Sequence, residues 1–235
     1  MALNRLIRHE LALPLAIAVA SRFYSIAALL LLTVGGTQRL PLLTNDTSPL
    51  AAWDGQWYLE IASGGYHAQA LQVGPNGGRL DVAFYPAWPA LIRFLSFGIW
   101  PYAGVAIVLA SLLFCLAALP IYEVLARHFD RRVALGGLAL IAFAPPSFVF
   151  SMAYTESLFL LLAASYFATS KGPLRVVLAG LSVLTRITGL AIVVSALFKA
   201  IRDRDRWAAL SVVAGYRAAI GILATLAIPV GGSAV

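Results

Sequence analysis

The chain has 235 residues, 61% of them hydrophobic and only 11% charged, and its mean hydropathy is +0.86. This composition excludes an ordinary soluble domain and indicates an integral membrane protein. The formal net charge of +7 does not indicate a nucleic-acid partner, because the basic residues stand in short clusters at the ends of apolar runs. The single cysteine, Cys115, excludes an intramolecular disulfide.

The apolar runs predict an all-α protein with one transmembrane domain over residues 1–235. The first run, 11–34, is long enough to cross a bilayer and follows two arginines, so we expect a cytoplasmic N-terminus. A polar outer loop over 35–101 comes next. Apolar and basic segments then alternate, and they predict further spans at 102–125, 133–150, 157–170 and 208–230.

Three arginines stand inside apolar segments: Arg217 in the last predicted span, and the candidate site residues Arg22 and Arg186. Arg22 lies within the first run, where a charge is costly enough that it usually faces a polar cavity or a partner; snorkelling to the interface is the alternative. Arg186 lies in 176–201, which as a single span would leave a basic cluster outside the membrane. We therefore expect a re-entrant pair, 176–185 and 188–201, that brings Arg186 toward the outer side. A single span with a buried Arg186 remains open.

A polar, aromatic-rich island occupies residues 52–66 of the outer loop. If residues 54–63 are helical, Asp54, Trp57 and Tyr58 share one face. A carboxylate beside aromatic rings suits a site that takes a proton from a hydroxyl while it holds a sugar or lipid. An equally open interpretation makes Asp54 a helix N-cap and the aromatic residues an interfacial belt.

A second polar island, residues 151–157, follows the paired prolines at 145–146 and is expected on the outer side. It contains Tyr154 and Glu156. Because Glu156 opens the next apolar run, where an acidic residue complements the helix dipole, its structural and catalytic interpretations are equally open.

Other short patterns do not indicate a site. The sequence Asp203-Arg204-Asp205 matches a D-x-D metal and nucleotide-sugar pattern, but it lies in a predicted cytoplasmic loop with no soluble domain to hold a nucleotide. Histidine and cysteine do not cluster, which argues against a structural zinc site.

Four islands, taken together and in order, resemble the PIG-V-like mannosyltransferases, a family that includes the second mannosyltransferase of GPI-anchor synthesis and bacterial relatives. They are Trp53-Asp54-Gly55-Gln56-Trp57-Tyr58, Ala83-Phe84-Tyr85-Pro86, Tyr154-Thr155-Glu156-Ser157-Leu158-Phe159 and Leu184-Thr185-Arg186-Ile187-Thr188-Gly189. The resemblance implies a GT-C type multi-span helical enzyme with an acidic residue in its first outer loop, where Asp54 is the matching position. It also implies a polyprenyl- or dolichyl-phosphate sugar donor, a glycolipid acceptor and inversion at the sugar.

The resemblance implies a role for Asp54, and the chemistry that it implies suggests roles for the other candidate residues. Asp54 would act as the base, and Arg22 and Arg186 would bind the donor phosphate. The expected contacts to sugar and acceptor are Trp53, Gln56, Trp57, Tyr58, Tyr85, Tyr154 and Glu156. We expect no cofactor and no obligatory metal, because the leaving group is a monophosphate and no acidic pair is evident outside the cytoplasmic loop.

Other functions fit parts of the pattern. The chain also suits a shortened, non-catalytic relative that serves as a subunit beside a partner. A lipid or sugar transporter would share the intramembrane arginines, but it would not need an acidic, aromatic helix in a long outer loop. Mannose rests on the resemblance alone. The expected location is the plasma membrane in a bacterium or the endoplasmic reticulum membrane in a eukaryote, with the site on the outer or lumenal side.

Overall fold

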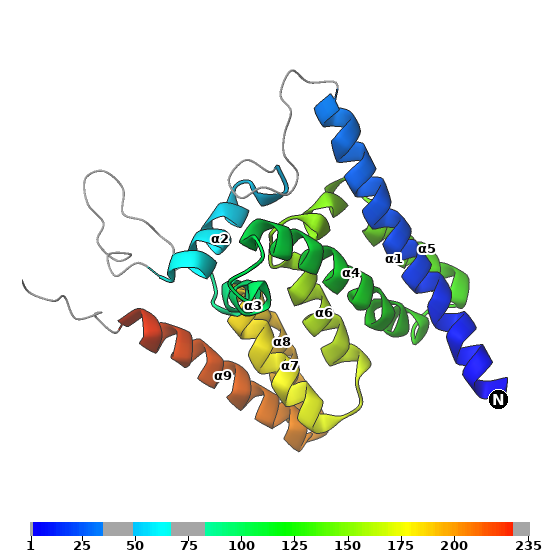
Figure 1. Ribbon diagram of the computed structural model, residues 1–235. Helices are drawn as coiled ribbons and strands as arrows, with labels where there is room; N and C mark the ends of the chain where they lie inside the picture. The colour runs from blue at the N-terminus through cyan, green and yellow to red at the C-terminus, as the bar shows by residue number, and fades with distance from the viewer. Residues whose placement is uncertain (1, 35–48, 67–82, 228–235) are drawn as a thin grey trace, which may run out of the picture.

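The computed structural model describes residues 2–34, 49–66 and 83–227 (Figure 1). The segments 35–48 and 67–82 of the predicted outer loop lie outside the described residues, as do 228–235. Every regular element of the described part is helical, in agreement with the predicted all-α class. In chain order the elements are α1 (Ala2–Val34), η1 (Pro49–Ala51), α2 (Asp54–Gly64), α3 (Ala87–Ser96), α4 (Tyr102–Ala126), α5 (Arg131–Phe143), η3 (Pro145–Ser151), α6 (Glu156–Ala168), α7 (Gly172–Thr185), η4 (Ile187–Gly189), α8 (Leu190–Asp203) and α9 (Arg206–Ala227).

The helices form two groups that α6 joins. Helices α1, α4 and α5 pack on one another, and α7 and α8 pack on α9, while α6 contacts both α4 and α7 (Figure 1). The short helices α2 and α3 lie together beside the N-terminal half of α4, apart from the N-terminus of the chain. This arrangement gathers the described parts of the outer loop at one end of the molecule.

Two of the described helices, α1 and α4, are long and apolar enough to cross a membrane. Helix α5 and η3 make a third when they are taken as one span, bent by 75° at their junction. Helices α6 and α7 are apolar but have only 13 and 14 residues, about 20 Å of helix, which is short of a bilayer core. The remaining crossings stay predictions, including the span at 208–230, where α9 carries an exposed Arg217.

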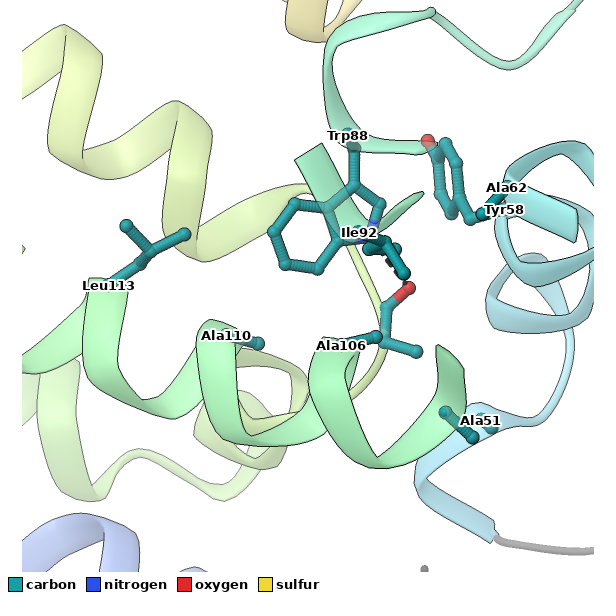
Figure 2. Close-up of a cluster of buried hydrophobic side chains, with 10 residues drawn as sticks. Ala51, Tyr58, Ala62, Trp88, Ile92, Ala106, Ala110 and Leu113 are labelled. Carbon is teal, nitrogen blue, oxygen red and sulfur yellow. Dashed lines mark hydrogen bonds between the residues drawn. The ribbon is translucent and has the colours of Figure 1, made fainter. Parts of the chain in front are cut away.

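Helix α4 presents a face of small residues to its neighbours. Ala103, Ala106 and Ala110 are fully buried and lie one turn apart along this face. Small side chains let helices approach closely, and α3 uses this space to insert Trp88 and Ile92, both 0% exposed, against α4 (Figure 2). This packing fixes α3 on the transmembrane part of the fold.

The helical backbone is interrupted at Arg186, between α7 and α8. A re-entrant pair requires such an interruption. Arg186 is extended, with φ −156° and ψ 154°, and η4 follows it before α8 begins. The break needs Gly189, because a Cβ at this position would lie 2.3 Å from the backbone oxygen of Ser182. The arrangement of the pair in a membrane remains a prediction.

Candidate active site

The island at 52–66 forms α2, and Asp54 is its first residue. Its N-cap is Trp53, at φ 53°, which makes no capping hydrogen bond with its side chain. Asp54 is therefore not the N-cap, and its carboxylate lies exposed in the first turn, where the helix dipole favours a negative charge. The helix ends at Gly65, whose φ of 81° is available to glycine at little cost.

The inner face of α2 carries aromatic rings onto the core. Tyr58 is 8% exposed and meets the ring of Phe84 edge-on at 5.0 Å between centroids, and Trp57 stacks on the same ring at 5.5 Å. At the other end of the helix, Arg93 of α3 donates to the carbonyl oxygens of Ala62 and Ser63, 3.1 and 3.2 Å away. Arg93 thus caps α2, a role the sequence analysis did not assign.

The second island lies directly against α2. The backbone N–H of Ala153 donates to the Leu50 oxygen at 2.7 Å, and the Ala153 oxygen accepts from the indole of Trp88 at 3.1 Å. A Cβ added at Gly55 would lie 3.4 Å from the Cβ of Ala153 and 3.5 Å from the ring of Tyr154. Even a small side chain at this position would be in van der Waals contact with the second island, so the two islands lie next to each other.

The approach gathers a polar cluster from three elements, which we call the carboxylate cluster: Asp54 and Tyr58 of α2, Tyr154, Thr155 and Glu156 at the start of α6, and Arg186 at the α7–η4 junction. Arg186 pairs with Glu156 at 2.5 Å, and both side chains are about 30% exposed. The Tyr154 hydroxyl donates to the Ala52 oxygen at 3.2 Å, and the buried Thr155 side chain lies close enough to Tyr58 to lower its pKa. Thr155 was absent from the predicted site.

Electrostatics confirm that these groups act on one another. Burial, followed by the negative charges of Asp54 and Glu156, raises the pKa of Tyr154 to about 12. The pKa of Tyr58 is also raised, chiefly by burial, and the charges of Arg186, Glu156 and Asp54 all act on it. Both phenols are therefore neutral near pH 7 and able to donate hydrogen bonds. No described residue forms an ion pair with Asp54, whereas Glu156 is paired.

The other predicted contact residues lie around this cluster. Trp53 is 72% exposed and Gln56 is exposed on the outer face of α2. Tyr85 follows Phe84 and is half-buried, and burial raises its pKa. An apolar groove of about 350 Å³ lies between α1, η1 and η3, and Trp53 forms part of its wall. The site thus combines a free carboxylate, an ion pair and an adjoining apolar surface.

Arg22 does not join the cluster. It is 4% exposed, and its guanidinium group donates to the oxygens of Ala142 and Ser147 and to the Ser151 hydroxyl at 3.1, 2.8 and 3.0 Å. The ring of Phe114 lies under it, 4.4 Å away. Phosphate binding by Arg22 stays a prediction, but here protein acceptors engage its guanidinium group.

Among the described residues, no three His, Cys, Asp or Glu side chains are placed together to hold a metal ion. The two carboxylates of the cluster belong to Asp54 and Glu156, and the cation beside them is Arg186. Independence from metal stays a prediction.

Comparison with known proteins gives one distant similarity. The chain is 31% identical over 130 residues to GPI mannosyltransferase 2 of Drosophila pseudoobscura pseudoobscura, and the match covers 50% of this chain and 26% of that protein. The chain thus matches about a quarter of the relative's length. No protein-family model matches the chain, and no solved structure matches it.

Proposed function

We propose that this chain carries the active site of a membrane glycosyltransferase that moves a mannosyl residue from a polyprenyl or dolichyl phosphate to a glycolipid acceptor, with inversion. One observation supports it above the others: the charges of the exposed Asp54 and of the Arg186–Glu156 ion pair all act on the neutral phenol of Tyr58, where three of the four islands that carry the family resemblance come together. The similarity to a GPI mannosyltransferase supports the same reaction class.

The chemistry follows from the difference between the two carboxylates. Asp54 has no ion-pair partner among the described residues, so it is free to accept a proton from the acceptor hydroxyl. The hydroxyl oxygen then attacks the anomeric carbon from the face opposite the phosphate. The bond from that carbon to the phosphate oxygen breaks, and its electron pair leaves with the lipid phosphate. A single displacement of this kind inverts the anomeric centre.

Arg186 is the group we assign to the leaving phosphate. Its side chain is 32% exposed, so the guanidinium group can contact Glu156 and a phosphate together. A fixed cation at this place stabilises the charge that develops as the bond to phosphate breaks. Glu156 in turn holds Arg186 in position and orients the acceptor.

The aromatic residues suit a sugar attached to a lipid. Tyr58 and Tyr154 are neutral hydrogen-bond donors, and Trp53, Trp57 and Tyr85 offer flat apolar surface. The apolar groove beside Trp53 favours a lipid-linked substrate over a water-soluble one. We place the enzyme in the endoplasmic reticulum membrane of a eukaryote or the plasma membrane of a bacterium, with Asp54 on the lumenal or outer side.

The test is a transfer assay in membranes that contain the protein, with radiolabelled polyprenyl-phosphate mannose and a lipid extract as acceptor. Asp54→Asn keeps the shape of the side chain and removes the base, so we expect transfer to fall at least about 100-fold. Asp203→Asn removes an exposed carboxylate outside the cluster and is the matched control, with unchanged transfer. Equal transfer by wild type and Asp54→Asn would remove Asp54 from the reaction.

The donor is tested in the same assay. Polyprenyl phosphates of glucose and galactose replace that of mannose, and we expect label in the lipid product from mannose alone. Transfer of another sugar would keep the reaction class and correct the donor. If wild type moves no sugar from any of the three donors while it accumulates in the membrane, the enzyme proposal fails for this chain and the non-catalytic subunit takes its place.

A further inference from the structure

The described part of the chain contains a broken helix close to the carboxylate cluster. Helix α5 ends at Phe143, and the paired prolines 145 and 146 turn the chain by 75° into η3. A helix that ends this way leaves carbonyl oxygens without intrahelical partners. In apolar surroundings such groups are costly unless another donor reaches them.

Arg22 supplies that donor from α1. Its two terminal nitrogens donate to the oxygen of Ala142, in the last turn of α5, and to the oxygen of Ser147, in the first turn of η3. A third hydrogen bond reaches the Ser151 hydroxyl at the end of η3, and Nε donates to Ser21. A cation is also favoured at the C-terminus of a helix by the helix dipole. The arginine therefore joins both sides of the break to α1.

The chain that leaves η3 runs straight into the carboxylate cluster. Met152 and Ala153 follow Ser151 and are 2% and 0% exposed. The Ser157 hydroxyl donates back to the Phe150 oxygen at 3.0 Å, which ties the start of α6 to η3. Tyr154 and Glu156 lie between Ser151, which is bonded to Arg22, and Ser157, which is bonded to η3. The short segment that joins the Arg22 contacts to the carboxylate cluster is therefore held at both ends.

We infer that Arg22 is a positioning residue: by holding η3 against α1 it sets Ala153 against Gly55, and so fixes the distance between Asp54 and the segment Tyr154–Glu156. The inference that Arg22 places this segment is based only on the hydrogen bonds of Arg22 and on the packing of Ala153. Its consequence for catalysis rests on the proposed function. In this assignment Arg22 acts through η3 and touches neither the sugar nor the phosphate.

A disulfide between positions 55 and 153 measures this placement without any assay of activity. The Cβ of a residue at position 55 would lie 3.4 Å from the Cβ of residue 153, close to the range of about 3.5–4.5 Å in disulfides. The background is Gly55→Cys, Ala153→Cys and Cys115→Ala, which removes the native thiol. Membranes are oxidised with copper phenanthroline, and the remaining thiols are counted with a maleimide that shifts the protein on a gel.

We expect rapid disulfide formation with Arg22 in place and at least about five-fold slower formation with Arg22→Met. The matched control is Arg127→Met. Arg127 also donates to backbone oxygens, those of Phe167 and Ala168, but it lies at the far end of α4 from α2. Its loss should leave the rate unchanged. Equal rates with Arg22 and with Met at position 22 would overturn the inference.

A milder variant covers the case in which Arg22→Met fails to accumulate in the membrane. Ser151→Ala removes one acceptor of Arg22 and nothing larger than a hydroxyl. We then expect about two-fold slower disulfide formation, since the variant removes one of the four hydrogen bonds of Arg22 and leaves the other three in place. An unchanged rate in Ser151→Ala would overturn the inference in that case.

Kinetics separate a positioning residue from a phosphate ligand. A positioning role predicts that Arg22→Met lowers kcat at least about ten-fold and changes the KM for the lipid-phosphate donor little. A raised donor KM with unchanged disulfide formation would return Arg22 to the phosphate. If the wild type transfers no sugar, the proposed function fails, and the disulfide rates still decide the placement of the segment.

Discussion

Arg22 and Arg186 are the two candidate phosphate ligands that the sequence places in apolar segments, and the structure gives them opposite surroundings. Arg22 is 4% exposed and makes four hydrogen bonds to protein oxygens. Arg186 is 32% exposed at its side chain and forms an ion pair with Glu156, and the charges of both residues and of Asp54 act on Tyr58. A buried guanidinium group with four of its five N–H donors on protein oxygens holds structure, whereas a partly exposed one with a single ion-pair partner has donors left for a ligand.

Stability should separate the two regions most clearly. Arg22→Met leaves several buried oxygens without a donor, so we expect the free energy of unfolding to fall by about 3 kcal/mol. Asp54→Asn alters an exposed side chain and should change it by less than about 0.5 kcal/mol. Thermal unfolding of the purified variants in detergent measures both. Equal losses would contradict the division into a structural and a functional region.

The backbone break before α8 gives the next largest effect. Gly189→Ala places a Cβ within 2.3 Å of the Ser182 oxygen, and a backbone atom cannot move aside cheaply. We expect a loss of about 2 kcal/mol in stability together with reduced transfer, because Arg186 lies at this break. Gly136→Ala in α5 is the matched control, since a Cβ there meets nothing within 4 Å. The control should be neutral or stabilise by about 1 kcal/mol.

The ion pair of Arg186 with Glu156 tests whether Arg186, unlike Arg22, acts on the substrate more than on stability. Its members are about 30% exposed, so a double-mutant cycle with Arg186→Gln and Glu156→Gln should give a coupling energy below about 1 kcal/mol in stability. The same Arg186→Gln variant should raise the KM for the lipid-phosphate donor, because it removes a charge that we assign to phosphate. Strong coupling in stability with an unchanged donor KM would make the pair structural.

The sequence predicted the positions of the helices better than it predicted the contacts between them. Helix positions follow from apolar runs and glycine, so α2 ends at the predicted Gly64–Gly65 pair and the chain breaks near Arg186 as expected. The partners of Arg22 were not predictable, because two of them are backbone oxygens that only a broken helix leaves free. The Pro145–Pro146 pair indicated the break but not what would reach it.

The site shows the same limit. Its members were identified from their residue types, but they meet where Gly55 lies against Ala153, two residues that carry no chemistry and that come together only in the folded chain. Thr155, Trp88 and Arg93 were missed as supporting residues for a similar reason. Each acts through a contact across the fold: with Tyr58, with the Ala153 oxygen and with the end of α2.

The smallest predicted effect is on the titration of Tyr154, whose pKa depends on the charges of the carboxylate cluster. Tyr154 has a pKa of about 12 in the folded protein, above the ordinary value of 10. Between these values the folded state keeps a proton that the unfolded state has lost, so stability falls as the pH rises through this range. Tyr154→Phe should remove that part of the fall. A difference spectrum of tyrosinate absorption, wild type minus Tyr154→Phe, follows the same group in the folded protein.

The difference spectrum also tests whether Asp54 acts on Tyr154. Burial is the first cause of the raised pKa and the charge of Asp54 is the second, so Asp54→Asn should move the titration of Tyr154 to lower pH without restoring the ordinary value. Asp203→Asn removes a carboxylate outside the cluster and should leave the titration in place. If both variants titrate as the wild type does, the Asp54 carboxylate does not face Tyr154, and the side chain that we assign as base points out of the cluster.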